Sequence, residues 1–196
     1  MLGSISDISN YLQDFLISIG IWGGLLGILL IVVESILPCL PLCVFITLVF
    51  LTFGNILGFF ICWIATVIGC LLSFTISKKM KNWIHKHIKK SKYHKKVDDM
   101  MMYIGEMKIS SLAMLVAVPF TPAFVVNIAA GLSDMSYKKF LVSMLIGKTF
   151  MVYFWGYVGV NMIECFTHPI YLVKILVMVF IAYILGKIVN KYVKVD

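Results

Sequence analysis

The chain has 196 residues and a formal net charge of +8, and 61% of its residues are hydrophobic. With a mean hydropathy of +1.00, it is more apolar than soluble domains, in which roughly 45–50% of residues are apolar. All 17 basic residues are lysine, and nine of them fall between residues 78 and 96. The composition therefore indicates one polytopic membrane domain, residues 1–196, with a basic cytoplasmic loop. It gives no reason to expect a nucleic-acid partner.

The first interruption of the apolar sequence is residues 34–41, inside a run from residue 15 to residue 76. Glu34 is the one charged residue of this run, and a charge at membrane depth costs at least about 2.5–3.5 kcal/mol. Pro38 and Pro41 follow it, and each proline removes a backbone donor and disfavours helical geometry at the preceding residue. Broken backbone at this depth is tolerated only inside protein or beside a wet cavity. The interruption therefore predicts a site.

A second interruption has the same P-x-x-P spacing. Pro119 and Pro122 lie inside the apolar run 109–132, and each half of this run is shorter than the about 20 residues that a full span needs. Corresponding breaks in the two halves of a membrane protein point to a transport site. We therefore expect two opposed re-entrant hairpins, at about 15–53 and 108–134, with their tips near the membrane midplane.

The rest of the chain predicts full spans and a basic segment. The expected spans are 56–77, 137–160 and 170–189, and the segment 78–107 is expected to be cytoplasmic. Within that segment, Asp98 and Asp99 are placed to cap a short helix, and a turn is expected at 53–55. The predicted fold is thus an all-α polytopic membrane protein with two opposed re-entrant helical hairpins and three full transmembrane helices, arranged like inverted repeats. A rival count, in which residues 15–77 form three full helices, stays open.

These features resemble the DedA superfamily of VTT-domain membrane proteins, also called SNARE-associated Golgi proteins, over roughly residues 10–190. The resemblance rests on Glu34-x-x-x-Pro38-x-x-Pro41 and on Pro119-x-x-Pro122 followed by Asn127 and Gly131. Further matching positions are Gly54, Gly58, Gly69, Phe140, Gly147 and Trp155-Gly156-Tyr157-x-Gly159. It implies two opposed re-entrant loops and the movement of lipids across a membrane. Undecaprenyl phosphate and glycerophospholipids are among the superfamily's substrates.

The chain departs from the superfamily pattern in its charged residues. Many members carry arginines around the second proline motif, where Val116 and Pro122 stand here. The first motif is followed by Leu42 and Cys43 in place of a common pair of small and acidic residues. These departures weaken the argument for a proton-coupled phosphate site that depends on arginine.

Lys148 is a basic residue in the middle of an expected span. It lies about 16 Å from Tyr137 at 1.5 Å per helical residue, which places it near the midplane of a bilayer core about 30 Å thick. Charges of opposite sign at this depth are expected to pair or to share one polar cavity, although a lysine side chain can also reach toward the membrane surface. We hypothesise that Lys148 contacts lipid phosphate, as arginines do in relatives, and that Glu34 gates this contact.

The leading expectation is a transporter, either a flippase or a scramblase, in a bacterial-type cell (inner) membrane. It would move phospholipid or polyprenyl phosphate between leaflets, and whether protons take part through Glu34 is left open. The helix N-termini that follow the breaks, at Leu42 and Ala123, favour an anionic group.

Structural alternatives accompany this expectation. Glu34 can be a neutral or hydrogen-bonded carboxyl, and Asn127 can be a polar contact between helices. The whole chain can be a membrane assembly or interaction protein that transports nothing. An intramembrane enzyme is not expected, because neither H-E-x-x-H nor G-x-S-x-G occurs. No cofactor or metal is expected either.

Overall fold

The computed structural model describes residues 20–37, 42–83 and 94–162, together with 173–174, 176–181 and 183–184. In this part of the chain all regular secondary structure is helical. Among the described residues, two helices are long and apolar enough to cross a membrane, or up to three if one bent pair of helices counts as a single span. An all-α membrane protein is therefore confirmed, while half of the expected span at 170–189 lies outside the described residues.

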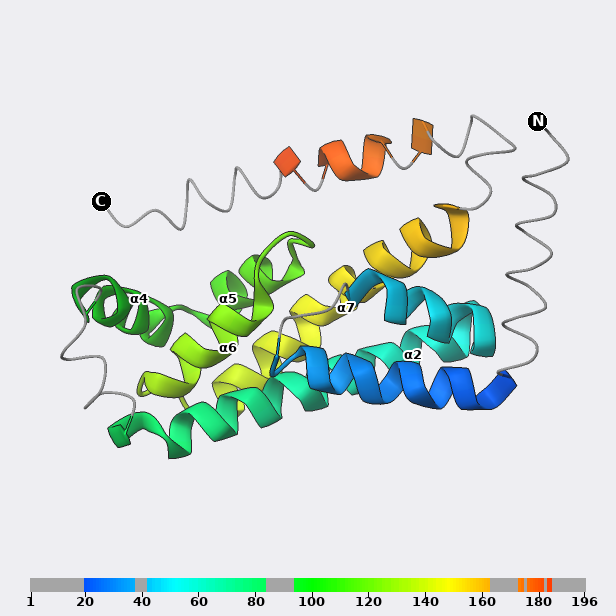
Figure 1. Cartoon of the computed structure of the whole chain (residues 1–196). Helices are drawn as coiled ribbons and strands as arrows, with labels where there is room; N and C mark the ends of the chain where they lie inside the picture. The colour runs from blue at the N-terminus through cyan, green and yellow to red at the C-terminus, as the bar shows by residue number, and fades with distance from the viewer. Residues whose placement is uncertain are drawn as a thin grey trace, which may run out of the picture.

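The first half of the molecule consists of the helix Gly20–Glu34 and α2, Leu42–Lys79 (Figure 1). The first helix packs antiparallel on the beginning of α2, because Gly24 approaches the side chains of Thr52 and Phe53 while Gly27 approaches Val49. Glycines allow such close approach of helices in lipid. The first helix ends at Glu34, as expected from the proline motif, although Pro38 and Pro41 themselves lie outside the described residues.

A sharp bend divides α2 at Gly54, where φ is 77° and ψ is 174°. Glycine adopts a positive φ at little cost because it has no Cβ atom, so the expected turn at 53–55 is present. Before the bend, α2 completes a helical hairpin with Gly20–Glu34, and after it α2 continues as a long apolar arm to Lys79. Within the described residues, neither helix of this hairpin reaches the about 20 residues that a full span needs.

The second half begins with α4, His94–Glu106, which is followed by α5, Ile109–Ala117, at a bend of 114°. The prediction that Asp98 and Asp99 cap this helix is wrong, because α4 begins at His94 and both acids lie inside it. The lysines that precede the acids are good helix formers, and they extend the helix toward the N-terminus.

The second P-x-x-P motif separates α5 from α6, Ala123–Leu132. Pro119 lies in the link between the helices, and Pro122 precedes the first residue of α6 with an extended backbone, φ −69° and ψ 92°. The expected break is therefore present, with two short apolar helices on either side of it.

The last labelled helix, α7, Tyr137–Met162, runs antiparallel to the long arm of α2. At the beginning of α7, the Phe140 ring stacks on the Phe74 ring with their centroids 4.3 Å apart. In its middle, the Leu145 carbonyl accepts a hydrogen bond from Trp63 Nε1 at 3.0 Å. Near its end, Gly156 packs against the Phe50 ring. Figure 1 shows α7 extending through the molecule, with α5 and α6 beside its first part and the first hairpin beside its last part. This helix therefore joins the two halves.

Lysine side chains gather at the end of the molecule where α2 finishes and α7 begins. Lys81 donates to Asp134 at 2.7 Å, Lys139 donates to the Gly105 carbonyl at 3.0 Å, and Lys78 donates to the Met135 carbonyl. The hydrogen bond from Lys81, and then its positive charge, holds the pKa of the exposed Asp134 carboxyl below its usual value. Exposed ion pairs contribute little stability, so this edge is informative mainly about orientation in the membrane.

We predict that this lysine edge is cytoplasmic and that the opposite end, which carries Asn55, is outside. The test uses Lys138→Cys and Asn55→Cys, each in a background without the native cysteines. A membrane-impermeant maleimide should label Asn55→Cys in intact cells and Lys138→Cys only after permeabilisation. The cysteine-free parent is the control, and labelling of both positions from the same side would contradict the topology.

Candidate functional site

Among the described residues, Lys148 is the most completely buried charged residue, with 1% of its surface exposed. The preceding residue, Gly147, lets α7 pack closely against α5. A Cβ atom on Gly147 would lie only 2.6 Å from the Ala113 carbonyl oxygen of α5, which is too close for any larger residue. The side chain is therefore held among helices and does not extend to the surface of the bundle. A buried charge is costly unless a partner of opposite sign or a polar group compensates it.

Glu34 supplies the opposite charge from the other half of the molecule. It is the half-buried last residue of the helix Gly20–Glu34, and the positive charge of Lys148 acts on its carboxylate. The end of this helix packs closely against α2. A Cβ atom on Gly69 of α2 would lie only 2.6 Å from Oγ of Ser35, the residue after Glu34. The two described side chains interact through space without forming a direct ion pair.

Asn127 on α6 is fully buried, at 0% exposure, and neither its amide nitrogen nor its amide oxygen has a hydrogen-bond partner in the structure. Such an unpaired buried amide costs about 1–3 kcal/mol. One turn further along, Gly131 fixes α6 on α2, because a Cβ atom there would lie 2.6 Å from the Phe74 carbonyl oxygen. The hydrogen bond that a purely structural role of Asn127 would need is thus missing, and the amide is left available to a ligand or to water.

The link between α5 and α6, which contains Pro119 and Pro122, lies against α7. The Phe120 ring contacts Phe154 and Trp155 edge-on, with ring centroids 6.2 and 6.0 Å apart. These contacts lie about 9–11 Å beyond Lys148 along the helix axis. The structure therefore packs the link that contains the second proline motif against α7, the helix that carries the buried lysine. The expected contact between the two proline motifs remains a prediction, because Pro38 and Pro41 are outside the described residues.

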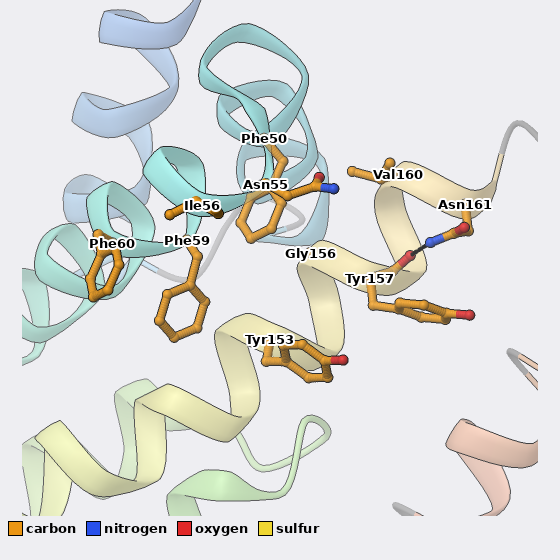
Figure 2. Close-up of a pocket in the computed structure, with 10 residues that line it drawn as sticks. All are labelled: Phe50, Asn55, Ile56, Phe59, Phe60, Tyr153, Gly156, Tyr157, Val160 and Asn161. Carbon is orange, nitrogen blue, oxygen red and sulfur yellow. Dashed lines mark hydrogen bonds between the residues drawn. The ribbon is translucent and has the colours of Figure 1, made fainter.

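Several features were not anticipated from the sequence. One is the hydrogen bond from Trp63 to α7, and another is a cavity of about 650 Å³ between the bend of α2 and the end of α7 (Figure 2). Its lining residues are Phe50, Asn55, Ile56, Phe59, Phe60, Tyr153, Gly156, Tyr157, Val160 and Asn161. The spacing of Tyr153 and Tyr157, one helical turn apart, was a signal for a shared face. Among the described residues, no group of histidine, cysteine and acidic side chains is suited to hold a metal ion.

Comparison with known proteins agrees with this architecture. The VTT domain model matches residues 40–161, more than half of the chain. The chain is also 28% identical over 186 residues to a protein of Bacillus subtilis (strain 168) named "Uncharacterized membrane protein YhjE", and the match covers 95% of this chain and 89% of that protein. No solved structure matches. The chain therefore belongs to the VTT-domain family of the DedA superfamily, and it is an integral membrane protein.

Proposed function

We propose that the protein moves phosphate-bearing lipids between the leaflets of a bacterial cell membrane. The observation that carries this proposal is the buried Lys148, whose charge acts on Glu34 across the junction of the two halves. A structural ion pair at this depth would gain most from direct contact, yet the two groups are not in contact. The superfamily resemblance, which implies lipid movement, supports the same function.

The headgroup phosphate would bind Lys148 through charge-assisted hydrogen bonds, which are about twice as strong as neutral ones. The N-terminus of α6 offers a second contact, because no side chain caps it and helix N-termini favour anions. The buried amide of Asn127 offers a third, with a donor and an acceptor that are both unpaired. The acyl or prenyl chains would remain in the surrounding bilayer while the headgroup crosses.

Glu34 would act as the gate in this proposal. When ionised, it competes with the phosphate for the positive charge of Lys148, and when protonated it releases that charge. Lipid movement should therefore become faster as the pH falls and Glu34 takes up a proton. A protein that couples transport to protons and one that merely exchanges lipids would both show this pH dependence, but only the coupled protein would respond to a pH difference across the membrane.

We predict that the purified protein accelerates exchange of a fluorescent anionic phospholipid between the leaflets of neutral phospholipid vesicles. Lys148→Met should slow this exchange by about 10–100-fold, because a hydrogen bond to a charged group is worth about 1.5–3 kcal/mol. Glu34→Gln should abolish the pH dependence of the rate. The readout is chemical quenching of the fluorophore in the outer leaflet.

Lys138→Met is the matched control, because Lys138 lies on the same helix but is exposed; its exchange rate should equal that of the parent. If Lys148→Met and Glu34→Gln keep the parental rate and pH profile, the two residues are structural. If the unmodified protein itself does not accelerate exchange, the alternative of a non-transporting assembly protein replaces this proposal.

Asn127 allows a separate test of function against stability. Asn127→Leu replaces an unpaired buried amide by an apolar side chain of similar volume, so the melting temperature in detergent should stay equal or rise. Lipid exchange should nevertheless slow, by about 2–10-fold for one neutral hydrogen bond. A drop in melting temperature without a change in the exchange rate would show that the amide stabilises the fold and does not contact lipid.

A further inference from the structure

The cavity between the bend of α2 and the end of α7 has two chemically different sides. Figure 2 shows the rings of Phe59 and Phe60 on one side, while the hydroxyl groups of Tyr153 and Tyr157 and the amide of Asn55 lie on the other. No lysine, acid or histidine belongs to the lining. The cavity therefore offers an apolar surface and uncharged hydrogen-bonding groups, and it has no counter-charge for an ionised ligand.

Its place in the fold indicates the source of the ligand. Both lining helices are long and apolar enough to span a membrane, and the cavity lies at the end opposite the lysine edge, beside Asn55 and Asn161. Ile56, at 74% exposure, continues the cavity onto the outer surface of α2. Tyrosine is enriched where the hydrocarbon core of a bilayer meets its polar boundary. With the lysine edge on the cytoplasmic side, as predicted above, a molecule that enters the cavity comes from the outer leaflet.

The volume of about 650 Å³ falls within the range of roughly 300–1,000 Å³ typical of small-molecule sites. An ester-linked lipid matches both sides of the cavity, since its chain fits against the aromatic rings and its ester carbonyls can accept hydrogen bonds from tyrosine hydroxyls and asparagine amides. A polyprenyl chain would match only the apolar side.

We propose that this cavity binds the ester region and one acyl chain of a glycerolipid from the outer leaflet. The inference rests on the proposed function in taking a membrane lipid as the ligand, and it adds a second site, separate from Lys148. Tyr153 lies about 7.5 Å beyond Lys148 along α7. A lipid held in the cavity therefore has its headgroup region on the outer side of the charged centre.

The test is photo-crosslinking in nanodiscs with a phospholipid that carries a diazirine on one acyl chain, followed by mass spectrometry of the labelled peptides. In the parent protein, crosslinks should concentrate on the peptides that contain Phe59 and Tyr153. Ile56→Trp should reduce them several-fold by filling the cavity. Ile64→Trp is the matched control, because Ile64 lies on the same arm of α2, is 52% exposed and is not part of the lining.

The ester contact is tested with an ether-linked phospholipid that carries the same diazirine chain. The ester-linked probe should label the cavity about 2–10-fold more strongly, as expected for one neutral hydrogen bond. The triple variant with Tyr153→Phe, Tyr157→Phe and Asn55→Leu should bring this ratio close to one. Equal labelling by the two probes in the parent would overturn the ester contact.

If the cavity peptides are labelled equally in Ile56→Trp and Ile64→Trp, the crosslinks come from lipid that surrounds the protein non-specifically, and the site is overturned. A disulfide that joins two copies of the chain through Tyr153→Cys, in a background without the native cysteines, would assign the cavity to a dimer contact and would overturn it as well. These readouts measure binding, so the cavity can be refuted while vesicle exchange persists. Conversely, a protein without exchange activity that still shows the predicted labelling would refute transport alone.

Discussion

The positive charge of Lys148 lies inside an apolar helical protein, and the arrangement around it follows from the need to compensate that charge. Glu34 approaches from the first half of the chain, at the end of a helix that stops before the first proline motif. The link that contains the second proline motif packs against the helix of Lys148, through the contact of Phe120 with Trp155. Helix α7 therefore connects the buried charge with the second interruption of the apolar sequence.

Close helix packing holds this charged centre in position. Gly147 sets the distance between α7 and α5, Gly131 sets the distance between α6 and α2, and Trp63 fixes α2 to the Leu145 carbonyl. In lipid there is no hydrophobic drive for helices to associate, so small residues and hydrogen bonds between helices carry the packing. Among the described residues, Asn127 keeps a buried amide without a hydrogen-bond partner, and a lipid headgroup is the partner that the proposed function supplies.

Much of this architecture was predictable because prolines, glycines and long apolar runs have direct backbone consequences. The break around Pro119 and Pro122 and the turn at Gly54 follow from these residues alone. The start of α4 was predicted wrongly, because the lysines before Asp98 are themselves compatible with a helix and α4 begins at His94, so an aspartate pair alone does not mark a helix start. The aromatic cavity was not predicted, because it depends on how the bend of α2 packs against α7. The relative position of two helices cannot be derived from the residue pattern of one sequence.

The central claim is that Glu34 and Lys148 compensate each other inside the protein, and a double-mutant cycle on stability tests it most directly. Glu34→Gln, Lys148→Met and the double variant are compared with the parent by denaturant unfolding in detergent. Each single change leaves one buried charge uncompensated, whereas the double change leaves none, so the account predicts a coupling energy of about 0.5–3 kcal/mol. Strictly additive effects of the two substitutions would contradict it.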